Sequence, residues 1–207
     1  MPSKLAPDFG LGPPATGRRR ELLDAAADVV AHGGLRALTH RAVDAQAGLP
    51  EGSTSSSYRT RLALLTALME HIAWLMAHRI EAARTRIADI PAQEHEQWVE
   101  EIVALAVDLA KQPRLVRVQA ELTLEAVRTP ELRLTFAPWR GRFLDLVGRI
   151  AEAVTPGVVE GRVETVVAAF QGVLTTSLIQ PDDERAAYVE RGTRQLLALL
   201  EQQPPQA

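Results

Sequence analysis

The sequence predicts an all-α fold, and three observations lead to that class. Apolar residues recur every three or four positions along most of the chain, which is the spacing of a helix that buries one face. No segment alternates apolar and polar residues as a half-buried strand does. Prolines and glycine pairs interrupt the periodic segments at short intervals, so we expect about nine helices with short connections and no internal repeat.

Capping residues, glycines and prolines set the expected helix boundaries. Thr16 and Thr39 are suited to N-caps, and the glycine pair at 33–34 ends the first helix. Pro113 and Pro130 suit a first helical turn, where the missing N–H costs nothing. We expect helices at residues 17–32, 39–46, 51–57, 61–88, 93–111, 113–129, 130–150, 158–180 and 182–203.

These helices form two parts that follow an N-terminal arm. Residues 1–15 hold four prolines and no apolar periodicity, so we expect a disordered arm. Residues 16–60 form a small three-helix domain, and residues 61–203 form a larger helical body. No linker separates the two parts, so we expect the helix over residues 61–88 to join them directly.

Composition and charge limit the kind of protein. Hydrophobic residues make up 46% of the chain, no apolar run approaches the roughly 18 residues of a membrane span, and there is no cysteine. We therefore expect a cytoplasmic protein. Residues 1–61 carry eight Lys and Arg against six Asp and Glu, whereas the rest carries fifteen against twenty. A basic end on an acidic body is typical of a protein that touches nucleic acid with one part, although an ordinary solvated surface gives the same asymmetry.

Residues 39–58 contain the motif with the clearest functional meaning. A short helix ends at Ala47, Gly48 turns the chain, Leu49 packs into the corner and a second short helix follows. The second helix exposes small hydroxyl side chains that suit close approach to a duplex, although hydroxyls discriminate bases poorly. These side chains are Ser53, Thr54, Ser55, Ser56 and Ser57.

This region resembles the N-terminal domain of the tetracycline-repressor (TetR) family. The matching pieces are His32-Gly33-Gly34-Leu35, Leu38-Thr39, Ala47-Gly48-Leu49, Gly52-Ser53, Tyr58-Arg59-Thr60-Arg61 and Leu64-Leu65. The family usually has Ser or Thr where Pro50 stands, often a tyrosine where Ser55 stands, and commonly a lysine where Arg61 stands. Asp44 replaces a small residue, and we interpret it as a local cap or partner.

The resemblance implies a set of DNA contacts and a homodimer. Phosphate contacts come from Thr39 and Arg41, and Ser53 to Ser57 face the major groove. Arg59 and Arg61 anchor the far phosphate strand, and Tyr58 belongs to the same DNA-binding set. Flanking phosphates or the minor groove are contacted by Arg18, Arg19 and Arg20. The last two helices pair across a two-fold axis, so that two reading helices meet a palindrome. The candidate dimer residues are Val163, Val166, Val167, Leu174, Leu178, Tyr188, Leu196 and Leu199.

A ligand site is expected in the body. Phe136, Trp139 and Phe143 form an aromatic stripe whose default interpretation is core packing, but a third of the nine aromatics lie in it. His71 and His78 have no third metal ligand at a supporting spacing, so we expect no metal or cofactor. The candidate pocket residues are Trp74, His78, Trp98, Gln119, Thr123, Phe136, Trp139, Phe143, Phe170 and Gln171.

The sequence thus predicts a ligand-responsive transcriptional regulator. Its simplest form is a homodimeric repressor that leaves a palindromic operator when a small apolar or aromatic molecule binds. An enzyme is disfavoured, because the chain has no Ser-His-Asp pattern, glycine-rich phosphate loop or metal cluster. The alternative is a helical protein-interaction adaptor with a degenerate helix-turn-helix, which Pro50 and the serines favour.

Overall fold

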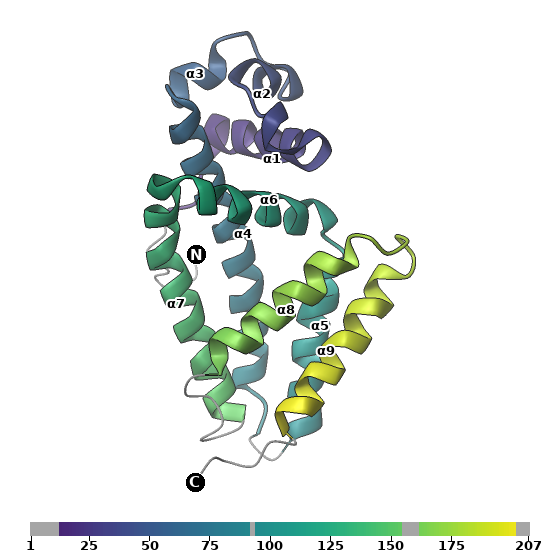
Figure 1. The fold of residues 1–207 in the computed structure, drawn as a ribbon. Coiled ribbons are helices and arrows are strands. Elements are labelled where there is room, and N and C mark those ends of the chain that lie inside the picture. The colour runs from purple at the N-terminus through teal and green to yellow at the C-terminus, as the bar shows by residue number, and fades with distance from the viewer. Residues whose placement is uncertain (1–12, 92–93, 155–161, 202–207) are drawn as a thin grey trace. The chain divides into compact units, whose positions relative to one another are not determined.

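The computed structural model describes residues 13–91, 94–154 and 162–201, and no strand occurs among them (Figure 1). The predicted all-α class is confirmed. Most of the predicted arm, residues 1–12, lies outside the described residues. In chain order the helices are α1 (Gly17–Ala37), α2 (His40–Gln46), α3 (Ser53–Ser57), α4 (Arg61–Ala88), α5 (His95–Ala110), α6 (Pro113–Arg128), α7 (Pro130–Val154), α8 (Val163–Ser177) and α9 (Arg185–Glu201).

Most helix boundaries lie where the sequence places them. α4 has the predicted span, and α6 and α7 begin at Pro113 and Pro130. α9 begins at Arg185 rather than at residue 182, because residues 182–184 form a turn. Asp182 in that turn accepts a hydrogen bond from the Arg185 guanidinium at 2.5 Å.

The chain folds as two compact units, each assembled from segments distant in sequence. The first unit holds the described residues up to Met76 together with Arg114–Arg140. The second holds Ala77–Pro113 and the described residues from Gly141 onward. The boundary between these units falls inside α4, so the functional division between residues 16–60 and 61–203 stays a prediction.

Apolar side chains of three helices fill the core of the first unit. Leu22 and Val30 of α1, Val43 of α2, and Leu64 and Leu68 of α4 are each at most 1% exposed. Burying a side chain of this size stabilises a fold by about 1.5–3 kcal/mol relative to leaving it in water. α2 packs on α1, and α3 packs on α2, so α1 supports α2 directly and α3 through α2.

α1 is interrupted near its end by Gly34. Its φ of 68° and ψ of 179° lie in a backbone region that is essentially open to glycine alone. The regular helix therefore breaks at the predicted glycine pair, and one further turn reaches Ala37. The Leu35 carbonyl, just beyond the break, accepts a hydrogen bond from the Arg61 guanidinium at 2.7 Å.

In the second unit α5, α8 and α9 pack against one another (Figure 1). Val167 and Leu174 of α8 are only 4% and 2% exposed within a single chain. The expectation that these two residues form a dimer surface is therefore wrong, because their face of α8 is already covered inside the unit. No helix in the described residues is long and apolar enough to cross a membrane.

Two glycine substitutions should change stability in opposite directions. Gly34→Ala should lower the free energy of unfolding by about 1–3 kcal/mol, since alanine is strained at this φ and ψ. Gly172→Ala should raise it by about 0.5–1 kcal/mol, because Gly172 lies in α8 with nothing within 4 Å of an added Cβ. Urea unfolding measures both. Equal effects of the two substitutions would contradict the break at Gly34.

Candidate nucleic-acid interface and ligand cavity

α2 and the turn after it have the geometry that the sequence motif requires. The Thr39 hydroxyl oxygen accepts a hydrogen bond from the Ala42 N–H at 3.1 Å, which confirms the predicted N-cap. Gly48 takes a φ of 65°, a left-handed conformation that favours glycine, so the chain reverses there. α2, the turn and α3 therefore form a helix-turn-helix.

Asp44 of α2 holds the start of α3. Its carboxylate is buried and accepts hydrogen bonds from the Gly52 N–H at 2.8 Å and the Thr54 N–H at 2.7 Å. The Thr54 hydroxyl donates a third at 2.5 Å. Pro50 has no side chain that can cap α3, and Asp44 satisfies the free N–H groups in its place.

The hydrogen bonds to Asp44 also determine its ionisation. Burial alone would raise the pKa of this carboxyl, because it disfavours the charged form. The hydrogen bonds from the hydroxyl and N–H of Thr54 and from the Gly52 N–H outweigh burial, with a further contribution from the charge of His40. The pKa of Asp44 is therefore below its ordinary value of 3.8.

His40 holds the other end of α3. Its Nε2 donates a hydrogen bond to the Tyr58 carbonyl oxygen at 2.6 Å, just after the last residue of α3. His40 and Asp44 are four residues apart and therefore share one face of α2. Together they fix both ends of α3 from beneath, so the position of α3 does not depend on its outer side chains.

The serines of α3 are placed largely as predicted, but Thr54 is not. Ser55 and Ser56 are exposed, and Ser53 and Ser57 are half-buried. Thr54 is fully buried, so the expectation that it faces the major groove is wrong. Its hydroxyl is turned inward by the hydrogen bond to Asp44.

The hydroxyls of three serines of α3 already donate hydrogen bonds to the backbone. Ser53 donates to the Pro50 carbonyl at 2.7 Å, Ser55 to the Gly52 carbonyl at 3.0 Å, and Ser56 to the Ser53 carbonyl at 2.7 Å. Their oxygen lone pairs remain able to accept hydrogen bonds. In this arrangement the surface of α3 presents acceptors rather than donors.

Cationic side chains flank the helix-turn-helix. Arg19, Arg41 and Arg59 are exposed and make no ion pair with any residue that the structure describes. Arg18 and Arg20 make only long, exposed pairs with Glu21 at 3.9 Å and Asp24 at 3.5 Å. Such pairs contribute little to stability, so all five guanidinium groups are accessible to phosphate.

Arg61 makes contacts that the sequence did not predict. Its guanidinium donates hydrogen bonds to the backbone carbonyl oxygens of Leu35 and Leu38. It thereby ties the start of α4 to the connection between α1 and α2. Arg61 is nevertheless exposed, so its role as a phosphate anchor stays a prediction.

α6 is bound to α1 by three of its side chains. Arg117 donates to the Ala31 carbonyl at 2.7 Å, and the Glu121 carboxylate accepts from the Leu35 N–H at 3.4 Å. In an unbroken helix the Leu35 N–H would bond to the Ala31 carbonyl, so these two side chains of α6 bind both partners of that pair. Arg114 adds an ion pair with Asp28 at 2.6 Å.

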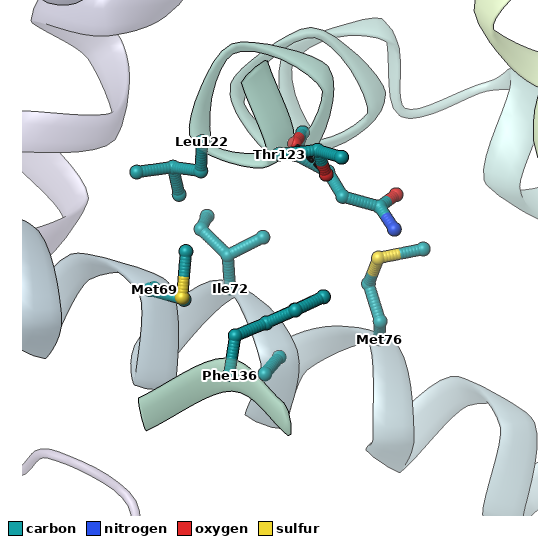
Figure 2. A pocket seen from close by; sticks show the side chains of 8 residues that line it. Met69, Ile72, Met76, Leu122, Thr123 and Phe136 are labelled. Carbon is teal, nitrogen blue, oxygen red and sulfur yellow. Dashed lines mark hydrogen bonds between the residues drawn. The ribbon is translucent and has the colours of Figure 1, made fainter. Parts of the chain in front are cut away.

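A small apolar cavity, partly open to solvent, lies within the same unit (Figure 2). Side chains of α4 and α6 face each other across it, and Phe136 of α7 lies along one side. Its wall contains no ionisable residue among those described. The lining residues are Met69, Ile72, Ala73, Met76, Gln119, Leu122, Thr123 and Phe136.

The cavity includes three of the predicted pocket residues, namely Gln119, Thr123 and Phe136. Trp74 does not line it, although it lies on α4, and the side chain of Trp139 lies outside the described residues. Trp98 is buried in the second unit, where its indole N–H donates to the Pro91 carbonyl at 3.3 Å. The remaining candidates also belong to the second unit and do not line this cavity: His78, Phe143, Phe170 and Gln171.

The sequence did not single out several residues that the structure places at these sites. The interpretation of Asp44 as a local cap or partner agrees with its hydrogen bonds to Gly52 and Thr54, but His40, four residues before it on the same face of α2, was not singled out. Met69, Ile72 and Met76 carry no distinguishing signal, because the helical spacing of a cavity wall is the same as that of a core.

Comparisons with known proteins agree with this architecture. A TetR-family protein from Streptomyces coelicolor A3 has a TM-score of 0.66 and 27% identity, covering 89% of this chain and 98% of that one. The multidrug binding protein EbrR crystallised with imidazole has a TM-score of 0.64 and 27% identity, covering 91% and 92%. EbrR crystallised with ethidium has a TM-score of 0.61 and 28% identity, covering 88% and 97%. No curated protein matches the sequence.

The helix-turn-helix and the helical body define a transcriptional regulator. The family model described as the tetracyclin repressor-like C-terminal domain matches residues 93–199, which is more than half of the chain. The chain therefore belongs to the tetracycline-repressor-like (TetR) family, as the sequence motifs of residues 22–65 predicted.

Replacing Asp44 tests the fixation of α3. Asp44→Asn should lower the free energy of unfolding by about 1–3 kcal/mol, because the amide cannot accept all three hydrogen bonds. Glu51→Gln, an exposed acid in the same turn, should change it by less than about 0.5 kcal/mol. Chemical denaturation of both variants measures the difference.

The effect of Asp44→Asn should also depend on pH. A carboxyl whose pKa is lowered on folding stabilises the fold above its unfolded pKa, and this contribution is lost as pH falls through the folded value. The stability gap between wild type and Asp44→Asn should therefore be full above about pH 5 and narrow below about pH 4. A gap independent of pH would contradict the ionised, hydrogen-bonded Asp44.

Proposed function

We propose that the chain is a homodimeric repressor that binds a palindromic operator and leaves it when a small apolar or aromatic molecule enters the cavity. The observation that carries the proposal is the position of α6. One set of its side chains lines the cavity, and another set holds α1. A molecule that moves α6 therefore acts directly on the helix that supports the helix-turn-helix.

The proposed DNA surface centres on α3 and the cations around it. Arg41 and Arg59 bind backbone phosphates, and Arg18, Arg19 and Arg20 bind flanking phosphates or enter the minor groove. The major groove receives α3, and the buried Thr54 supports it from within. Arg61 ties the start of α4 to the end of α1. The remaining contacts are made by Thr39, Ser53, Ser55, Ser56, Ser57 and Tyr58.

The protein leaves DNA if the ligand prefers a conformation in which α6 no longer makes its hydrogen bonds to α1. Binding energy shifts the equilibrium only to the extent that the ligand discriminates between the two conformations. The two hydrogen bonds between α6 and α1, donated by Arg117 and accepted by Glu121, support that discrimination, because they depend on the position of α6. EbrR, crystallised with ethidium, supports ligand binding by a related fold.

The proposed dimer uses the outer faces of α8 and α9. Leu199 is 60% exposed and Ile179, which the sequence did not single out, is 80% exposed. Exposed apolar side chains of this size favour a partner surface. Val167 and Leu174 no longer belong to the candidate dimer interface. Its remaining members are half-buried: Val163, Val166, Leu178, Tyr188 and Leu196.

Binding to the DNA upstream of the protein's own gene tests the proposed operator. Fluorescence anisotropy should show affinity that falls steeply with salt, because phosphate contacts dominate. Arg41→Ala and Arg59→Ala should each reduce the salt slope by about 1 without changing thermal stability. Arg61→Ala should instead lower stability and affinity together.

The outcome of this experiment also decides between classes of function. Absence of salt-dependent DNA binding by the wild-type dimer would favour the protein-interaction adaptor. An Arg61→Ala variant that keeps full stability but loses one unit of salt slope would show Arg61 to be a phosphate contact.

Substitution of Arg117 tests the role of α6 in release. For a molecule that releases the wild-type protein, found by thermal-shift screening, Arg117→Ala should bind it normally. The factor by which that molecule weakens DNA binding should shrink about fivefold. Arg128→Ala is the matched control, because Arg128 lies on α6 and pairs only with Glu125 at 3.9 Å among described residues. Equal effects of the two substitutions would rule out the α6–α1 contacts as the route.

A further inference from the structure

The turn between α2 and α3 carries one exposed acid, Glu51, in the middle of the proposed DNA surface. Residues 39–61 contain a single other acid, Asp44, and its carboxylate is buried. The other exposed charged groups of this segment are arginine guanidinium groups. A carboxylate on a surface that faces phosphates lowers the affinity for DNA of any sequence, because like charges repel. Glu51 therefore favours binding only where a particular base offsets this repulsion.

Glu51 is not used to hold the fold together. It makes no hydrogen bond or ion pair with any residue that the structure describes. An acid at this point of the chain could cap α3, but the free N–H groups of Gly52 and Thr54 already donate to Asp44. Both oxygens of the Glu51 carboxylate are therefore available to a group outside the chain.

The place of Glu51 in the helix-turn-helix is the part that reads bases. In this motif the residues at the start of the second helix contact base edges in the major groove. Glu51 directly precedes Gly52, the N-cap of α3. The hydroxyls of Ser53 and Ser56 donate to backbone carbonyls, so their oxygens are left to accept. Glu51 thus adds a charged acceptor to a surface that already presents acceptors.

An accepting surface selects the bases that carry an amino group at the major-groove edge. Cytosine presents N4 and adenine presents N6, whereas guanine and thymine present only acceptors there, with a methyl group on thymine. A carboxylate favours cytosine over adenine, because adenine N7 is an acceptor beside the amino group and repels the second carboxylate oxygen. The chemistry of Glu51 therefore matches cytosine.

We propose that Glu51 reads a cytosine in each operator half-site through the N4 amino group, and that its charge weakens binding to other sequences. This inference rests on the proposed function of α3 as the helix that enters the major groove. Both effects have one cause: a carboxylate that loses water beside phosphates is compensated only where an amino group donates to it. Glu51 then contributes to specificity rather than to affinity.

In vitro selection from duplexes with a random core tests the base preference on the full-length protein. The wild type should select a half-site in which one position is cytosine. Glu51→Gln should select adenine at that position, since an amide both donates and accepts and so matches adenine N7 and N6. Fluorescence anisotropy should show that replacing this cytosine by adenine weakens the wild type about tenfold and strengthens Glu51→Gln. Glu51→Ala should lose the preference.

A duplex of shuffled sequence measures the effect of the charge alone. Glu51→Gln and Glu51→Ala should both bind it about threefold more tightly than the wild type, because each removes a charge that repels phosphates. Glu131→Gln removes an exposed acid in the first turn of α7, outside the helix-turn-helix. This control should leave the selected sequence and both affinities unchanged. Thermal unfolding of each variant confirms that the fold is retained.

Two results would overturn the proposal: selection of the wild-type sequence by Glu51→Gln, or unchanged binding of the shuffled duplex by both Glu51 variants. Salt dependence, measured in parallel, separates this inference from the proposed function. Salt-dependent binding with an unchanged base preference would contradict the role of Glu51 and leave the proposed function standing. A wild-type protein that selects no sequence and binds no duplex would contradict both.

Discussion

The buried carboxylate of Asp44 is the interaction on which the DNA-reading part of the molecule depends. α3 has five residues, which is too short to be stable as an isolated helix. A buried carboxylate is costly unless it is hydrogen-bonded, and Asp44 meets this condition only when α3 is in place. The free N–H groups at the start of α3 and the charge on α2 therefore stabilise each other. Because this fixation involves buried groups of α2 and α3, it does not use the exposed side chains of Ser55 and Ser56.

The end of α1 shows a second dependence of the same kind. Gly34 breaks the helix, and side chains from α6 bind the Ala31 carbonyl and the Leu35 N–H on either side of the break. A net hydrogen bond contributes only about 0.5–1.5 kcal/mol, and somewhat more when one partner is charged. These contacts are therefore weak enough for the binding energy of a small molecule to disrupt them. In an unbroken α1 the Leu35 N–H and the Ala31 carbonyl would bond to each other, and α6 would keep the Arg114–Asp28 ion pair.

The sequence predicted features that depend on neighbouring residues, and it missed features that depend on contacts between distant residues. Apolar spacing and prolines located the helices, and Thr39, Gly48 and the corner residues located the helix-turn-helix, because these signals are local. The inward rotation of Thr54 could not be predicted, since it depends on a carboxylate ten residues away that is brought close only by folding. Arg61 binds carbonyl oxygens at the end of α1, more than twenty residues away in sequence, and only folding brings them close. Val167 and Leu174 belong to an apolar stripe that could equally face a core or a partner, and only the packing of α8 on α5 and α9 shows that they are buried within the unit.

The orientation of the serine hydroxyls limits how the helix-turn-helix can recognise DNA. Ser53, Ser55 and Ser56 donate their hydrogens to backbone carbonyls, so they can accept from base amino groups without rearrangement. Donating to a phosphate requires the hydroxyl to leave its carbonyl, which exchanges one hydrogen bond for another and contributes little net energy. Affinity must then come mainly from the guanidinium groups, which do not distinguish sequences. In the proposed docking, sequence preference would rest on a few accepting oxygens and on the shape of the duplex that α3 enters.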